Sequence, residues 1–186
     1  MPNSALLVMD VQRDIVDLVD DGSGYLPRLC KGIDGARAAG IPVIYVAVGL
    51  RPGQPDVSTR NKVLSSAVRD GLFTEGSPGT EIHPDVTPRD GEIVVTKRRG
   101  SAFSGSDLDL VLRARGIDSL VLTGIATSGV VLHTLCQAND LDFGLTVLAD
   151  ACLDIDPEVH RVLTGKLFPQ WADVVTVEDW CEALTS

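Results

Sequence analysis

Short apolar runs alternate with helix-forming segments along most of this chain, and this alternation limits the possible folds more than any other feature. Six runs predict strands, at residues 5–9, 43–48, 92–96, 120–122, 145–148 and 173–177. Six further segments predict helices, at residues 26–39, 59–70, 106–115, 128–139, 157–167 and 178–184. Such alternation forms a parallel sheet with helices on both faces and right-handed crossovers. We therefore predict an α/β protein with three layers, a mostly parallel six-stranded sheet and a single domain over residues 1–186.

The intervening segments are polar or rich in glycine and proline, and they predict loops. Residues 12–24 are polar and acidic, and residues 49–58 contain several glycines and prolines. The longest such segment, residues 71–90, holds three glycines and three prolines. Because long loops in compact domains often cover sites, residues 71–90 are a candidate lid.

The charge of the chain argues against two classes of partner. Its formal net charge is −10 at pH 7, and its longest basic cluster is Lys97-Arg98-Arg99. Neither nucleic acid nor an anionic membrane surface is therefore an expected partner. The N-terminal residues lack a basic region followed by a long apolar stretch, and no apolar run approaches about 18 residues. We expect no signal peptide, no transmembrane helix and a cytoplasmic location.

The cysteines and histidines show no spacing typical of a metal site. The cysteines lack the CxxC pattern, and the histidines stand far apart without an HExxH motif. These residues are Cys30, Cys136, Cys152, Cys181, His83, His133 and His160. We expect reduced thiols. The sequence also lacks GxGxxG after the first strand, the P-loop motif and GxSxG, so it predicts neither a nucleotide cofactor nor a nucleophile elbow.

Residues suited to chemistry follow three of the predicted strands. Asp10 ends the first strand, Lys97 follows the third, and a Gly-rich turn at residues 124–130 follows the fourth. Ligands bind outside the carboxyl ends of strands in open parallel sheets, so we expect these three features to meet there. A partly buried carboxylate beside an ammonium is a proton-transfer pair, because each group perturbs the pKa of the other. Either residue alone would indicate only a cap or a surface charge.

Four segments of the chain occur together and in a specific order: LLVMDVQ, VTKRRGSAF, LVLTGIATSGVV and LADAC. In this combination the chain resembles the isochorismatase-like, or cysteine hydrolase, superfamily over residues 5–175. The resemblance implies a three-layer Rossmann-like fold with a sheet of six parallel strands, a catalytic aspartate at Asp10 and a lysine at Lys97. It also implies a homo-oligomer, either a dimer or a tetramer.

The same resemblance gives the turn after the fourth strand a role. It implies a cis peptide bond between Ile125 and Ala126, just after Gly124. It also implies an oxyanion hole made by the backbone N–H groups of Ala126 and Val130. Helix N-terminal N–H groups suit that task, because they lack intrahelical partners and lie at the positive end of the helix dipole.

One residue departs from the amidase members of this family. Where those enzymes have a nucleophilic cysteine, this chain has Val130. An isopropyl group cannot act as a nucleophile, so a thioester route through residue 130 is excluded. Cys136 lies almost two helical turns further on, and we expect both it and Cys152 to be structural thiols. Thr127 and Ser128 lie on the turn itself, where helix capping is their expected role.

Some members of the family work without the cysteine and cleave a vinyl ether. A general acid protonates the vinyl carbon, an oxocarbenium ion forms, and water adds to it. Asp10 would be that acid and Lys97 would hold it, so burial would have to keep the carboxyl protonated against the nearby ammonium. The candidate substrate-binding residues are Gln12, Arg98, Phe103 and Thr127, with Arg99 and Arg51 as further partners for a carboxylate.

We therefore expect a hydrolase of a small anionic metabolite that uses no cofactor, with vinyl-ether cleavage as its most concrete reaction. Two alternatives stay open: an amidase that uses another nucleophile, and a non-catalytic protein that binds small molecules in the same pocket. Metal-dependent relatives have an Asp/His cluster after the second strand. The corresponding segment here, GLRPGQPDVSTRNK, contains no histidine, so we expect no metal.

Overall fold

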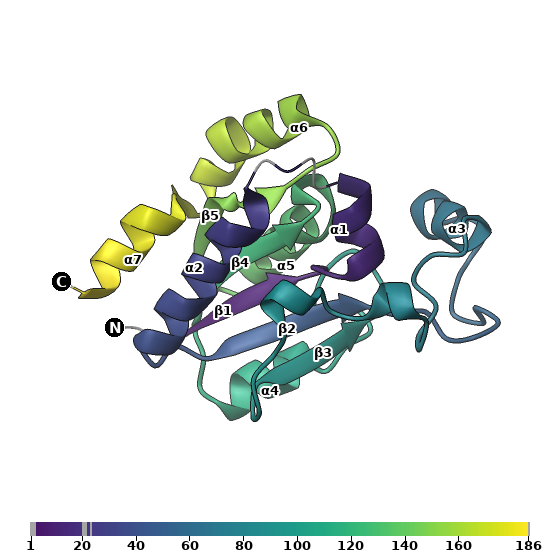
Figure 1. Cartoon of the computed structure of the whole chain (residues 1–186), viewed down its shortest axis with the longest axis horizontal. Helices are drawn as coiled ribbons and strands as arrows, with labels where there is room; N and C mark the ends of the chain where they lie inside the picture. Colours follow the sequence, from purple (N-terminus) through teal and green to yellow (C-terminus); the bar gives the residue numbers. More distant parts are fainter. Residues whose placement is uncertain (1–2, 20–21, 23, 186) are drawn as a thin grey trace.

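The computed structural model describes residues 3–19, 22 and 24–185, which form an α/β fold around a six-stranded sheet (Figure 1). The strands are β1 (Ser4–Met9), β2 (Val43–Val48), β3 (Ile93–Lys97), β4 (Ser119–Ile125), β5 (Gly144–Leu153) and β6 (Asp173–Val175). All neighbouring strands pair in parallel, in the order β3-β2-β1-β4-β5-β6. The predicted fold class is confirmed, and each predicted strand has a counterpart.

Helices cover both faces of the sheet (Figure 1). They are α1 (Arg13–Val19), α2 (Tyr25–Ala38), α3 (Lys62–Arg69), α4 (Leu108–Ala114), α5 (Leu132–Asp140), α6 (Pro157–Val162) and α7 (Val177–Thr185). The central strands are buried on both sides, so alternate residues enter two different cores. Leu6 and Val8 pack with α1, α2 and α7, whereas Leu7 and Met9 pack with α4 and α5.

One predicted loop is wrong, because residues 12–24 contain helix α1. Val16 is buried, and Ile15 and Val19 pack against the same core as α2. The apolar positions of α1 do follow helical spacing, but the helix has only seven residues and acidic side chains separate these positions. Residues 20, 21 and 23 of the predicted loop lie outside the described residues.

Several other boundaries differ from the prediction, among them those of β5, α5 and α4. β5 continues beyond Asp150, since Cys152 pairs with Gly124 after a register shift in β4. The helix predicted at residues 128–139 begins as a π-helical turn, η3 (Thr127–Val131), before α5. α4 begins after Asp107 rather than at residue 106, and the Ser106 hydroxyl donates to the carbonyl of Ala102 at 2.6 Å and accepts from the Leu108 N–H at 3.3 Å.

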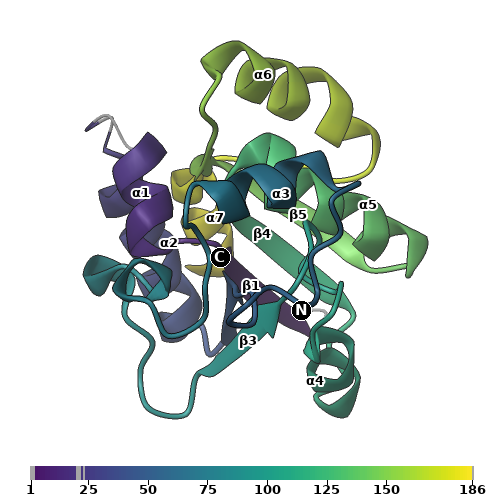
Figure 2. The same ribbon diagram turned by 90° about the vertical axis from the view of Figure 1, so that its right-hand side faces the viewer.

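The strand order places β1 and β4 side by side at the centre of the sheet, where the chain changes direction across it. In open α/β sheets this switch point is where ligand sites form. The carboxyl ends of the strands face right in Figure 1, and α3 projects beyond them. Figure 2 looks onto that side and shows α3 across the front, with α1 on one side and α5 on the other.

Residues 71–90 are largely irregular, as predicted, apart from two 3₁₀ turns, η1 (Pro78–Thr80) and η2 (Pro84–Val86). Two isolated bridges fasten this segment to the body, one from Ile82 to Gln12 and one from Thr74 to Leu50. In the part of the chain that the structure describes, each helix is too short or too polar to cross a lipid bilayer.

Candidate active site

A cavity of about 440 Å³ opens at the carboxyl ends of β1, β3 and β4. Asp10, Lys97 and residues of the turn 124–130 all line it, so the structure brings together the three features that the strand ends predicted. Ligand pockets for small organic molecules span about 300–1,000 Å³. This cavity is therefore large enough to enclose a metabolite of modest size.

Asp10 and Lys97 form an ion pair on the floor of this cavity. The Asp10 Oδ2 atom lies 2.9 Å from the Lys97 Nζ atom, and the two side chains are only 8% and 3% exposed. The ammonium also donates to the carbonyl oxygen of Arg99 at 2.8 Å. Strand register sets this geometry, since Lys97 pairs with Val48 and the Asp10 N–H donates to the Val46 carbonyl at 2.7 Å. The two side chains thus reach each other across the end of β2.

Burial and the neighbouring ammonium act on the pKa of the Asp10 carboxyl in opposite directions. Burial raises its pKa above the ordinary value of 3.8, and this effect outweighs the charge and hydrogen bond of Lys97 and the smaller effect of the Val48 backbone, all of which lower the pKa. The Oδ1 atom is buried and has no hydrogen-bond partner among the described residues. One oxygen of Asp10 therefore contacts the ammonium, while the other is left for a ligand.

The turn after β4 brings its backbone very close to β1. Gly124 pairs with Met9 and has a φ of 139°, and a Cβ atom there would lie 2.1 Å from the Met9 carbonyl oxygen. Only glycine fits such an approach. The next peptide bond, Ile125–Ala126, is cis, as the family resemblance implies. Val130, which the family resemblance predicts at the position of the cysteine, is buried and lines the cavity.

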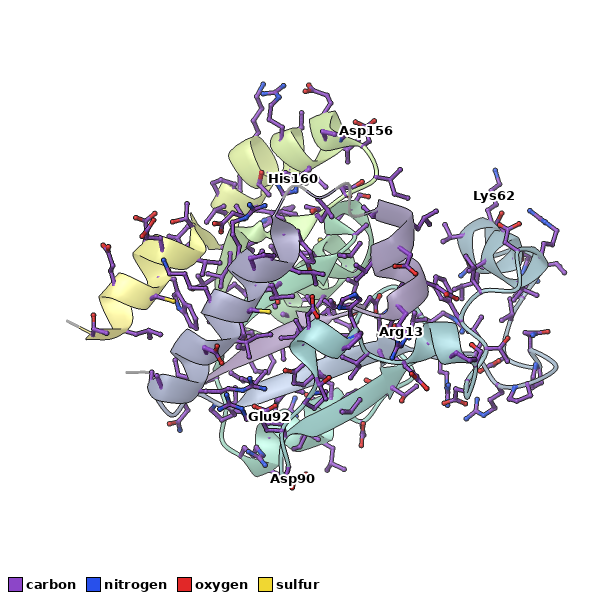
Figure 3. The ribbon with its side chains drawn as sticks, in the orientation of Figure 1. Arg13, Lys62, Asp90, Glu92, Asp156 and His160 are labelled. Atoms are coloured by element: carbon purple, nitrogen blue, oxygen red, sulfur yellow. The ribbon has the colours of Figure 1, made fainter. Side chains whose placement is uncertain are left out.

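Two residues that were not predicted as site residues make hydrogen-bonding contacts with the turn after β4. The Oδ2 atom of Asp154 accepts a hydrogen bond from the Ser128 N–H at 2.6 Å. The His160 Nδ1 atom lies 2.8 Å from the Thr127 hydroxyl, and Figure 3 shows His160 on the side of α6 nearer the sheet. Burial lowers the pKa of His160, opposed by the carboxylate of Asp154. Both residues follow β5, whose end was predicted too early.

Three of the predicted substrate-binding residues have structural contacts and do not line the cavity. The Gln12 side chain accepts from the Val48 N–H at 2.8 Å and donates to the carbonyls of Val48 and Thr80 at 3.0 and 2.8 Å. It thus joins β2 to η1. Phe103 packs against Phe143, with ring centroids 6.0 Å apart. Thr127 is buried and engaged with His160.

Arg98, the fourth of these residues, is also engaged elsewhere. It pairs with Glu75 at 2.8 Å, and its Nε atom lies 3.9 Å from Asp56, which pairs with Arg51 at 3.1 Å. Arg99 lines the cavity instead. Its guanidinium donates to the carbonyl oxygens of Arg98 and Asp56 at 2.6 and 2.8 Å, with no carboxylate at ion-pair distance among the described residues. Arg99 is therefore the cation whose charge a bound anion would neutralise.

His133 and Phe73 line the cavity without having been predicted there. The His133 Nδ1 atom lies 2.6 Å from the Gly129 carbonyl oxygen, which can only accept, so Nδ1 carries the hydrogen. In the neutral ring, Nε2 is then an acceptor. A Cβ atom at Gly100 would lie 3.0 Å from His133 Cγ, so the ring packs directly over this glycine. Phe73 is the one residue of 71–90 in the lining, and α3 rather than that loop overlies the opening.

None of the four cysteines lines the cavity, and all are free thiols. Cys152 is buried, and burial raises its pKa to about 12. Burial also raises the pKa of Cys136 on α5. No thiolate is therefore placed to attack a ligand in the cavity. Within the described ranges, no three His, Cys, Asp or Glu side chains lie together as a metal site would require.

Comparisons with known proteins agree with this fold. The Isochorismatase domain model matches residues 4–179. Ureidoacrylate amidohydrolase RutB of Pseudomonas syringae is 34% identical, over 96% of this chain and 82% of the relative, and the isochorismatase family protein YwoC of Bacillus subtilis is 31% identical, over 96% and 93%. An isochorismatase family protein from Desulfovibrio vulgaris has a crystal structure with a TM-score of 0.86 and 28% identity over both whole chains. The chain belongs to the isochorismatase family of hydrolases.

Proposed function

We propose that this protein hydrolyses the vinyl ether of a small carboxylate without a cysteine nucleophile, and that Asp10 is its general acid. The observation that carries the proposal is the environment of the Asp10 carboxyl. Burial raises its pKa, and its Oδ1 atom has no protein partner in the described structure although Asp10 lines the cavity. An acid catalyst needs both a retained proton and a free path to the substrate.

The reaction has three steps. The Asp10 carboxyl gives its proton to the terminal carbon of a group R–O–C(=CH₂)–COO⁻, which becomes an oxocarbenium ion. Water adds to the cationic carbon and loses a proton, and the resulting hemiketal breaks down to the alcohol ROH and pyruvate. The proton lost by the water balances the one that Asp10 supplied. No step forms a bond to the protein, which is consistent with valine at position 130.

Other groups of the lining have matching roles. Lys97 holds the Asp10 carboxyl in place through its Oδ2 atom. Arg99 supplies a positive charge for the substrate carboxylate, since among the described residues its guanidinium bonds to carbonyl oxygens and to no carboxylate. The Nε2 atom of His133 accepts the proton of the attacking water, because Nδ1 is engaged with Gly129. The N–H groups of Ala126 and Val130 stabilise the negative charge that develops on the hydroxyl oxygen of the hemiketal as it collapses.

The direct test is pyruvate release from 2-alkoxyacrylates, measured by coupling to NADH oxidation. The wild-type protein should release pyruvate, and Asp10→Asn should lower kcat/KM by about 10²–10⁴-fold, as expected for loss of a general acid. Asp173→Asn is the matched control, because Asp173 is an exposed residue of β6 far along the sheet from the site. Full activity in Asp10→Asn would show that another group supplies the proton.

Amide hydrolysis is the second candidate, because the relative RutB is named as a ureidoacrylate amidohydrolase. No thiol lines the cavity of this chain, so water would be the nucleophile and ionised Asp10 its base. The two reactions require opposite protonation states of the same carboxyl. Activity that falls as pH rises through the raised pKa of Asp10 supports the acid, whereas activity that rises on ureidoacrylate supports the base. Binding without any product would indicate a non-catalytic member of the family.

A further inference from the structure

The walls of the cavity are far more apolar than its floor. Eleven of the nineteen residues that line it have aliphatic or aromatic side chains. The charged and polar groups that the proposed reaction uses lie at the carboxyl ends of β3 and β4 and after β1. A ligand that fills the cavity would therefore meet charge at one end and hydrocarbon along the rest of its length.

Three aliphatic residues at the mouth are exposed to a degree that is unusual for their type. Leu18 on α1, Val63 on α3 and Ile155 after β5 are 66%, 75% and 69% exposed, and all three line the same cavity. They come from three separate elements, so the sequence does not group them. Isolated exposed aliphatic residues are common, but several around one opening mark a surface that gains by being covered.

The part of the cavity between floor and mouth is continuous with this apolar rim. Leu64 and Phe73 line it from the side of α3, and Ile15 and Val19 line it from α1. A small polar substrate would leave these side chains in contact with water. A substrate with an apolar portion would displace that water and gain about 0.8 kcal/mol for each methylene group buried.

We propose that the substrate is an amphipathic carboxylate, with its reactive polar group on the floor and an apolar tail that extends to Leu18, Val63 and Ile155. The identity of the reactive group rests on the proposed function. The tail rests only on the lining of the cavity, and it can be tested by binding alone. In the terms of the proposed reaction, the tail is the R group of the vinyl ether.

The test is calorimetric titration of the protein with butanoate, hexanoate and octanoate, three simple carboxylates that differ only in chain length. The dissociation constant should fall by about fourfold for each added methylene until the tail reaches the mouth. The triple variant Leu18→Ser, Val63→Ser, Ile155→Ser should weaken octanoate by about tenfold or more and leave butanoate within about twofold. Since all three residues are exposed, their replacement should leave the fold intact, which thermal unfolding checks.

The matched control is Leu110→Ser on α4, because Leu110 is 70% exposed but does not line the cavity. It should bind all three carboxylates as the wild type does. Affinity that does not depend on chain length, or an equal loss in the control, overturns the inference. It is also overturned if the triple variant keeps its affinity for octanoate but dissociates in sedimentation, because the rim would then be a contact between two copies of this chain.

The same measurements separate this inference from the proposed function. Binding that tightens with chain length, without pyruvate release from any 2-alkoxyacrylate, would refute the vinyl-ether reaction and keep the amphipathic ligand. The converse result is pyruvate release that is equally efficient for methoxy and octyloxy substrates, with no chain-length dependence in binding. That result would keep the vinyl-ether reaction and refute the amphipathic ligand.

Discussion

The floor and the mouth are built in different ways, although both belong to the same cavity. Asp10 and Lys97 on the floor are fixed by strand register and almost fully buried. Leu18, Val63 and Ile155 at the mouth stand on helices or loops and are largely exposed. The comparison teaches that the reacting groups depend on the sheet for their position. The choice of substrate depends instead on exposed side chains whose replacement should change the stability of the fold little. Substitutions in the two regions should therefore differ in kind.

The largest effect on stability is expected at Gln12, which lies outside the cavity and joins the end of β2 to η1. Gln12→Leu should lower the free energy of unfolding by about 2–4 kcal/mol, because it leaves the buried N–H and carbonyl of Val48 and the carbonyl of Thr80 without their partners. Urea unfolding measures this loss. Gln170→Leu on the surface is the control and should change stability by less than about 0.5 kcal/mol. Equal losses in both variants would contradict the role given to Gln12.

The next effect is a dependence of stability on pH that comes from Asp10. Its folded pKa is raised, so the stability it contributes is fully present below the unfolded pKa of about 3.8 and is lost as pH rises through the folded pKa. Relative to Asp10→Asn, the wild type should lose up to about 1.4 kcal/mol per pH unit within that window. Urea unfolding of both proteins at a series of pH values measures the difference.

Lys97→Met sharpens this prediction. Removing the ammonium takes away a charge that lowers the pKa of Asp10, so the window should extend to higher pH. A stability difference that stays constant with pH in both comparisons would show that the Asp10 carboxyl titrates normally.

Val130→Cys tests how accessible the floor is. Val130 lines the cavity together with Asp10, so a thiol at this position would face the cavity. The neighbouring Val131 is buried and does not line the cavity, so a thiol there would be covered. Iodoacetamide should therefore modify Val130→Cys at least about tenfold faster than Val131→Cys, since modification follows exposure of the thiol. Mass spectrometry of the peptide that contains residue 130 or 131 measures both rates, and equal rates would mean that residue 130 is sealed off.

The smallest effect is expected at the mouth. Val48 and Ile155 both line the cavity, but Val48 is buried at the end of β2 and Ile155 is 69% exposed. Val48→Ala should cost about 1–2 kcal/mol of stability, whereas Ile155→Ala should cost less than about 0.5 kcal/mol. Urea unfolding gives both values, and a cost at Ile155 as large as that at Val48 would erase the distinction between floor and mouth.

Most of the sheet could be predicted because each strand is a short apolar run bounded by polar residues. The helix α1 could not, because a seven-residue helix offers two turns of pattern and only Val16 among its residues is fully buried. The end of β5 was missed since Asp150 resembles a strand terminus, yet its carboxylate accepts the N–H of Val177 while the strand continues to Leu153.

The site divides in the same way. Asp10, Lys97 and the turn 124–130 were found from the sequence because strand ends in a parallel sheet must meet at one edge. The sequence could not show whether Arg98 or Arg99 lines the cavity, because this depends on which side chain the loop after β3 directs toward it. Arg98 is drawn to Glu75, and Arg99 is left at the cavity. His133 gave a sequence signal, as a histidine one turn into the helix after the turn, but its role depends on the space that Gly100 leaves.

The close approach at Gly124 has a consequence for how this protein can change. The two halves of the chain meet there with no volume to spare, so any larger residue would force β1 and β4 apart where they deliver the acid and the turn. A saturation library should accept one amino acid at position 124 and many at position 155. Evolution or design of a new substrate specificity therefore has to begin with the exposed residues at the mouth, because the contact between β1 and β4 at Gly124 accepts no larger residue.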